Sequence, residues 1–181
     1  MEKTLLKIAE KFNRKDISWA IGASYLLKLY NIVDKANDLD ILVLKDDLKQ
    51  AASILDKIGT KQAIEVKKEY SSKKFYKYHI NGVEVDLFAG LVINYNNSFY
   101  DYHFEQKSIT DYKKINNVLI PLASLEDWYI LYSLMPRKEN KVKLLEEHFN
   151  KQNIKNPEIF NEILKKDLPN ELKNSINTLL K

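Results

Sequence analysis

An apolar stripe at every second position marks two segments of the chain as strands. In residues 38–44 the stripe faces away from Asp38 and Asp40, and in residues 83–88 it faces away from Asp86. Side chains alternate between the two faces of a strand, so each segment has one face that can join a core and one that carries acid. The pattern therefore predicts two half-buried strands with carboxylates on their outer faces.

Further strand-like runs are bounded by turn residues. They are expected over residues 17–21, 63–68, 73–80, 109–115 and 118–122. The turns between them are marked by Ser71-Ser72, Asn81-Gly82 and Asn116-Asn117. Asparagine followed by glycine is a strong signal for a two-residue hairpin, so the strand that precedes this pair is expected to lie antiparallel to the strand of Asp86.

Longer runs with apolar residues three and four positions apart predict helices. Such runs cover residues 2–13, residues 24–32 and a segment that follows Asp46 and Asp47, either of which can cap it. Beyond Ser124, which fits a helix N-terminus, every periodic segment is helical. The C-terminal third of the chain is therefore expected to be a set of helices.

Strands and helices are mixed in the first part of the chain, and helices alone follow. This order predicts an α/β (α+β) fold, with a mixed sheet flanked by helices over residues 1–120 and a C-terminal helical segment over residues 121–181 that packs on it. A length of 181 residues with 45% hydrophobic residues is sufficient for such a core.

Residues 91–105 are rich in asparagine, tyrosine and phenylalanine. Aromatic rings of this kind can stack on a base or frame an acceptor molecule. The simpler interpretation, which we expect, is a loop packed over the edge of the sheet.

The overall charge and composition exclude some classes of protein. The chain has 29 basic and 25 acidic residues, a net charge of +4, which is compatible with an anionic substrate without specifying one. It has no cysteine, so disulfides and thiolate metal sites are excluded. Neither a signal peptide nor an apolar run of about 20 residues is present, and a cytoplasmic protein is expected.

The acidic faces of the two strands predict a metal site. Asp38 and Asp40 point the same way, and Asp86 completes the group if its strand lies beside theirs. Neighbouring carboxylates in an apolar setting repel each other and lose hydration, so a cation is expected among them. Oxygen ligands favour Mg²⁺ or Mn²⁺ over zinc.

The turn at Gly22, Ala23 and Ser24 offers a place for an anion. It follows a short apolar strand and opens a helix, whose first backbone N–H groups and positive dipole end suit phosphate oxygens. Gly22 allows close approach, and the Ser24 hydroxyl can add a donor, although it can also serve only as a cap. Phosphate on one side and acid-held metal on the other indicate phosphoryl or nucleotidyl transfer.

Taken in order, the Gly22-Ala23-Ser24 turn, the Asp38-Leu39-Asp40 strand and Asp86 resemble the signature of the DNA polymerase β-type nucleotidyltransferase superfamily. Within it, the chain is most similar to small bacterial nucleotidyltransferase-like proteins, including the AbiEii-type toxins. The segment from Val118 to Trp128 resembles the strand and helix start that follow the core in those proteins. The resemblance covers roughly residues 15 to 150.

The resemblance implies a metal-dependent enzyme that moves an NMP group from an NTP to an acceptor hydroxyl on RNA, protein or a small molecule. Asp38, Asp40 and Asp86 would then be the catalytic and metal-binding residues. Gly22, Ala23 and Ser24 would bind the nucleotide. An antitoxin-like partner is also implied.

Two departures from the family pattern leave an alternative open. Ala23 stands where a second glycine or a serine is usual, and Tyr132 stands where a lysine is frequent. A non-catalytic nucleotide- or partner-binding module on the same fold would tolerate both. An RNA-binding protein without chemistry fits less well, because the only arginines are Arg14 and Arg137.

Overall fold

The structure, a computed structural model, describes residues 1–64 and 75–181. It divides the chain into two compact units, Met1–Ala123 and Ser124–Lys181. Among the described residues, none of the helices has both the length and the apolar character needed to cross a membrane.

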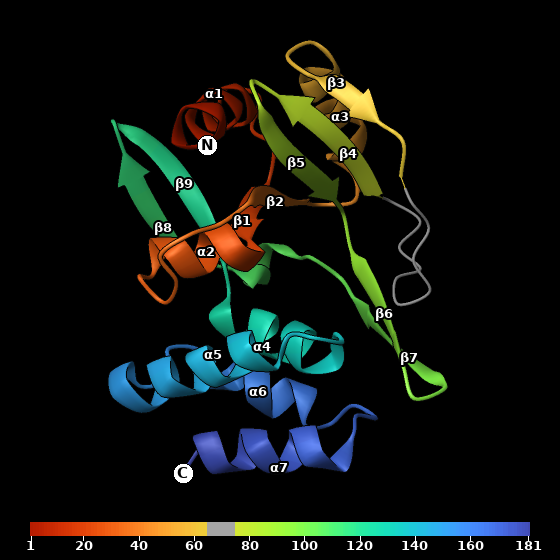
Figure 1. Ribbon diagram of the computed structural model, residues 1–181, viewed down its shortest axis with the longest axis vertical. Helices are drawn as coiled ribbons and strands as arrows, with labels where there is room; N and C mark the ends of the chain where they lie inside the picture. The colour runs from red at the N-terminus through yellow and green to blue at the C-terminus, as the bar shows by residue number, and fades with distance from the viewer. Residues whose placement is uncertain (65–74) are drawn as a thin grey trace. The chain divides into compact units, whose positions relative to one another are not determined.

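The first unit contains three α-helices, one 3-10 helix and nine strands among its described residues (Figure 1). In chain order they are α1 (Glu2–Asn13), β1 (Trp19–Gly22), α2 (Ala23–Leu29), β2 (Asp38–Val43), α3 (Leu48–Asp56), β3 (Thr60–Gln62), β4 (Phe75–Ile80), β5 (Val83–Phe88), β6 (Leu91–Tyr95), β7 (Ser98–Tyr102), η1 (Gln106–Ser108), β8 (Ile109–Ile115) and β9 (Val118–Ala123).

Seven of these strands form one mixed sheet in the order β3-β4-β5-β2-β1-β9-β8. β2 lies at its centre, antiparallel to β1 on one side and parallel to β5 on the other. The inward face of β2 carries Leu39, Ile41 and Val43, all with no exposed surface. The apolar stripe seen in the sequence is thus the core face, as predicted, and the aspartates lie on the opposite face.

Helices complete the core of this unit. α1 contacts α3 and β9, and α2 contacts β1 and β2 (Figure 1). The ring of Phe12 on α1 meets Trp19 edge-on, with ring centroids 5.8 Å apart. Asp47 occupies the N-cap position of α3, but its carboxylate accepts a hydrogen bond from the Ser18 backbone N–H at 2.8 Å. The predicted capping acid therefore ties the helix start to β1, because it bonds to the residue just before that strand.

Three hairpins in this unit use two-residue turns in which both central residues have positive φ. The central pairs are Asn81-Gly82, Asn96-Asn97 and Asn116-Asn117. Positive φ at both positions matches the right-handed twist of the flanking strands, and asparagine tolerates this conformation better than most residues. The first and third turns were predicted from the sequence.

The segment expected as a loop over residues 91–105 is instead largely a separate two-stranded sheet of β6 and β7. Ile93, Tyr100 and Tyr102 are buried on it, while Phe99 keeps 64% of its surface exposed. The aromatic residues thus alternate in burial along a strand, which the composition of the segment concealed. The strand predicted over residues 63–68 and the turn at Ser71-Ser72 fall mainly outside the described residues, and the described strand nearby is β3.

The second unit consists of helices. They are α4 (Leu125–Leu134), α5 (Glu139–Gln152), α6 (Pro157–Ile163) and α7 (Asn170–Leu179). The Ser124 hydroxyl accepts a hydrogen bond from the Asp127 backbone N–H at 2.8 Å, so the predicted N-cap of α4 is confirmed. Glu126 is 1% exposed, and its carboxylate accepts hydrogen bonds from both the backbone and the side-chain nitrogen of Asn156.

Three aromatic rings form the centre of this helical unit. Tyr129 on α4, Phe149 on α5 and Phe160 on α6 contact each other edge-to-face, with centroid separations of 5.6 to 5.9 Å. The Tyr129 hydroxyl donates a hydrogen bond to Glu146 at 2.9 Å. Burial, together with this carboxylate, raises the pKa of Tyr129 well above its usual range, so the hydroxyl stays a donor.

Candidate active site

The three predicted carboxylates lie together at one place on the outer face of the sheet. One oxygen from each of Asp38, Asp40 and Asp86 lies within 4.8 Å of the others. Each side chain is half-buried. Among the residues that the structure describes, this is the group of acidic and histidine side chains arranged closely enough to hold a metal ion.

Strand register explains why these acids meet. β2 and β5 are parallel and in register, with Asp40 opposite Asp86 and Asp38 opposite Glu84. Directly opposite residues on neighbouring strands project from the same face, about 4.8 Å apart along the hydrogen-bonding direction. The alternation seen in each strand therefore converges on one acidic surface.

The same register extends to the strands on either side. On β1, Gly22 lies opposite Asp40, and on β4, Lys77 lies opposite Asp86. Four adjacent strands thus contribute one residue each to a transverse row, formed by Gly22, Asp40, Asp86 and Lys77. The predicted anion-binding turn, which begins at Gly22, therefore lies next to Asp40 on β2.

The turn itself departs from the sequence prediction in one detail. The helix begins at Ala23 and not at Ser24, and it has seven residues with Gly22 as its N-cap. Ala23 has φ of +47°, a left-handed conformation that is unusual for a residue with a Cβ atom. The backbone between β1 and α2 is therefore strained at the position where the family pattern has glycine or serine.

The similarity of this chain to known proteins lies in its structure. No protein-family model matches the chain, and no curated protein matches it either. Solved structures do match. A candidate nucleotidyltransferase from Thermotoga maritima is 19% identical, with a TM-score of 0.62 over 83% of this chain and 92% of that one. The chain has the nucleotidyltransferase fold.

Two further structures with this fold are similar. A lincosamide antibiotic adenylyltransferase solved with lincomycin bound is 14% identical, with a TM-score of 0.53 over 81% of this chain and 96% of that one. The antibiotic-resistance factor ANT(2″)-Ia, solved with adenylyl-2″-tobramycin, is 12% identical, with the same TM-score over 81% of this chain and 86% of that one. The structural similarity agrees with the predicted mixed sheet and flanking helices. At such low sequence identities it shows the fold alone, so the chemistry has to be argued from the residues of this chain.

Within the nucleotidyltransferase fold of this chain, two residues of the acidic surface, Lys77 and Glu84, were given no role by the sequence analysis. Lys77 lies 2.7 Å from Glu84 and 4.0 Å from Asp86. The hydrogen bond to Glu84 raises the pKa of Lys77, with the charges of Asp86 and Asp38 adding to it, and the same bond lowers the pKa of Glu84. The two-residue Asn81-Gly82 turn carries the signal that was available, because it fixes which residues of β4 and β5 face each other.

The strained turn gives a prediction about stability. Ala23→Gly should stabilise the first unit by up to about 1 kcal/mol, because release of a left-handed alanine outweighs the greater freedom of glycine in the unfolded chain. Urea unfolding would measure the change. As a control, Ala51→Gly in the interior of α3 should destabilise by about 1 kcal/mol or more, since Ala51 is fully buried there. A loss of stability in both variants would contradict the strain at Ala23.

Proposed function

We propose that this chain is a metal-dependent nucleotidyltransferase that moves a nucleoside monophosphate group from an NTP to the hydroxyl of an acceptor. The observation that carries the proposal is the meeting of Asp38, Asp40 and Asp86 on one face of a sheet with the nucleotidyltransferase fold. Three acids gathered at one place in a fold shared with adenylyltransferases favour catalysis over simple binding.

The donor set fits a small hard cation. Mg²⁺ and Mn²⁺ prefer carboxylate oxygens, and octahedral ligands about 2.1 Å from Mg²⁺ stand at most about 4.2 Å apart. The oxygens of the three acids, within 4.8 Å of one another, are close to that limit and need only small side-chain rotations. Asp38 and Asp40 would hold the ion beside the triphosphate, with Asp86 on the acceptor side.

Each residue has a defined part in the proposed reaction. The turn of Gly22, Ala23 and Ser24 binds the β- and γ-phosphates through backbone N–H groups and the serine hydroxyl. When bound, the metal ion supplies positive charge that offsets the charge of the triphosphate. Asp86 accepts the proton of the acceptor hydroxyl, whose oxygen attacks the α-phosphorus. The bond between the α-phosphorus and its bridging oxygen breaks, and pyrophosphate leaves.

The acceptor is a hydroxyl on a small molecule, RNA or protein. Small molecules should be tested first, because two structures with this fold hold an antibiotic or an adenylylated antibiotic.

We also propose that the chain is close to AbiEii-type toxins and works with an antitoxin-like partner. Two further predictions remain: that residues 121–181 pack on the core, and that the protein is cytoplasmic.

A second candidate is a non-catalytic nucleotide- or partner-binding module. The left-handed Ala23 favours it, because a Cβ at this turn restricts the approach of phosphate to the backbone. Tyr132, in place of the frequent lysine, favours it as well. Nucleotide binding without turnover would support this module.

The experiment that tests the proposal follows two radioactive labels. The protein is incubated with Mg²⁺ or Mn²⁺ and acceptor pools of small molecules, RNA and protein, using ATP labelled at either the α- or the γ-phosphate. We expect transfer of the α label only, because the nucleotidyl group moves and pyrophosphate leaves. A chelator should abolish the signal. Transfer of the γ label would indicate a kinase, and binding without any transfer would favour the non-catalytic module.

A further inference from the structure

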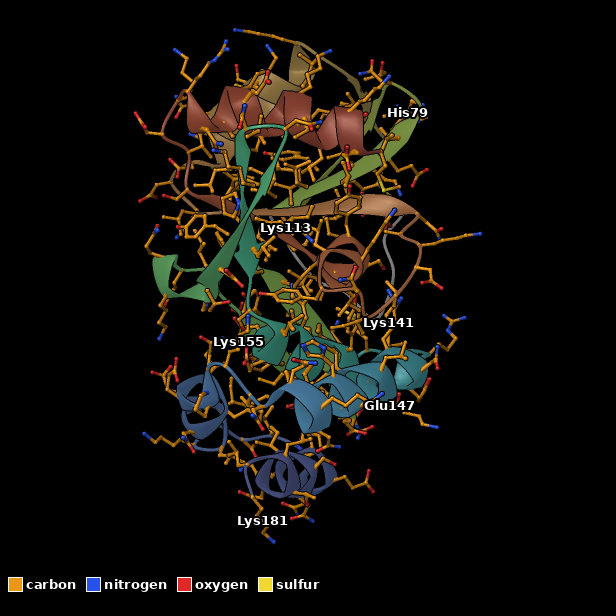
Figure 2. The ribbon with its side chains drawn as sticks, turned by 90° about the vertical axis from the view of Figure 1, so that its left-hand side faces the viewer. His79, Lys113, Lys141, Glu147, Lys155 and Lys181 are labelled. Carbon is orange, nitrogen blue, oxygen red and sulfur yellow. The ribbon has the colours of Figure 1, made fainter. Side chains whose placement is uncertain are left out.

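Lys77 places a positive charge next to the acidic cluster, and it comes from a third strand, β4. It stands on β4 opposite Asp86 of β5, which in turn stands opposite Asp40 of β2. The side chains of Lys77 and Asp86 therefore project from the same face as the acids of β2. His79, which Figure 2 labels near the end of β4, follows Lys77 by two residues and lies opposite Glu84.

The ammonium group of Lys77 is shared unequally between two carboxylates. Its nitrogen lies 2.7 Å from an oxygen of Glu84, which is hydrogen-bonding distance, and 4.0 Å from an oxygen of Asp86. The side chain of Glu84 is 56% exposed, whereas that of Asp86 is 16% exposed. The cation is thus bound by the outer acid and stands close to the inner one.

This placement puts positive charge at the border of the proposed metal site. A lysine 4.0 Å from Asp86 attracts that carboxylate and repels a divalent cation bound to it. Glu84 has the opposite influence, because it draws the ammonium away from the cluster. Glu84 is positioned to do so by register, since it lies opposite Asp38 and two residues before Asp86 on the same face.

We propose that Lys77 is an internal counter-cation of the acidic cluster, shared between Glu84 and Asp86, and that Glu84 strengthens the binding of a divalent cation beside Asp86 by retaining Lys77. The proposal rests on the metal site of the proposed function and adds two positioning residues to it. Lys77 limits the affinity of the cluster for metal, and Glu84 restores part of that affinity by holding Lys77 aside.

The test measures Mn²⁺ binding without nucleotide, by the electron paramagnetic resonance signal of free Mn²⁺. Lys77→Met should tighten binding by about fivefold or more, since a cation next to the site is gone. Lys61→Met is the matched control. Lys61 is a lysine of β3 that projects from the opposite face of the sheet to Lys77, with its nitrogen 4.0 Å from the ring centroid of Tyr76. Its loss should change binding less than twofold.

Glu84→Gln separates retention of Lys77 from a simple loss of negative charge. In the natural chain it should weaken Mn²⁺ binding about three- to fivefold, because Lys77 moves toward Asp86. In the Lys77→Met background the same change should cost less than about twofold, since there is no ammonium to release. Equal factors in the two backgrounds would overturn the role of Glu84, and no tightening in Lys77→Met would overturn that of Lys77.

Asp40→Asn distinguishes failure of this inference from failure of the proposed function. If Asp40→Asn binds Mn²⁺ as tightly as the natural chain, the metal site itself is wrong, and the inference is wrong with it. If Asp40→Asn loses the ion while Lys77→Met binds like the natural chain, only the inference is wrong.

Discussion

Replacement of Asp40 by asparagine should lower nucleotidyl transfer by about a thousandfold or more while leaving the protein folded. Asparagine keeps the shape of the side chain and the backbone hydrogen bonds of β2 but removes the charge that would hold the metal. Metal stabilisation of a transferring phosphoryl group contributes several kcal/mol, and each 1.36 kcal/mol is a factor of ten in rate. The rate of α-label transfer, measured at saturating Mg²⁺, gives the result directly.

A matched control comes from the other end of the same strand. Asp46 is an exposed acid just beyond β2. Asp46→Asn removes an equal charge at a position outside the cluster, so it should change the rate by less than about twofold. Thermal unfolding of both variants should resemble that of the natural chain. Retention of more than a tenth of the activity in Asp40→Asn would show that the acidic cluster is not where the reaction takes place.

Replacement of Phe160 by alanine should destabilise the helical unit by about 3 to 5 kcal/mol. Phe160 has no exposed surface and contacts both Tyr129 and Phe149, so the change removes a ring at the junction of three helices. Deletion of a buried phenylalanine costs the transfer free energy of the ring together with the cavity that remains. The free energy of unfolding of a domain is only about 5 to 15 kcal/mol, so this loss would be a large part of it.

The design of this measurement uses the two tryptophans of the chain. In a Trp19→Phe background, fluorescence comes from Trp128 on α4 and reports on the helical unit during urea unfolding. Phe99→Ala is the control, because it removes the same ring from a side chain that is 64% exposed and should cost less than about 0.5 kcal/mol. Equal effects of the two changes would contradict the aromatic centre of the helical unit.

The sequence was sufficient to predict the central strands because their apolar stripe has a period of two residues. Leu39, Ile41 and Val43 had to share a face, and the acids had to lie on the other. The Asn81-Gly82 turn predicted the antiparallel pairing of β4 and β5, because this pair is typical of a two-residue hairpin. The meeting of Asp86 with the β2 acids needed more, since parallel pairing of β2 with β5 is a long-range choice that no local signal encodes; the family resemblance supplied it.

The positions that sequence reasoning missed depend on neighbours far along the chain or on exact backbone angles. The partition of Lys77 between two acids follows from three strands in register, and a lysine in a lysine-rich sequence gives no signal of its own. The left-handed conformation of Ala23 is invisible in composition because alanine favours helices. The hairpin of β6 and β7 was hidden by its three asparagines, of which the structure places two at the turn and one in β6.

The transverse row of Gly22, Asp40, Asp86 and Lys77 implies that the gene can change more freely by substitution than by insertion within these strands. One extra residue inside any of the four would turn its member of the row to the other face, and for Asp40 or Asp86 it would place a carboxylate in the core. Loops are free of this restriction, because lengthening the connection between α2 and β2 costs little. Divergent descendants of this chain should therefore differ in length at its loops and keep the spacing of these strands.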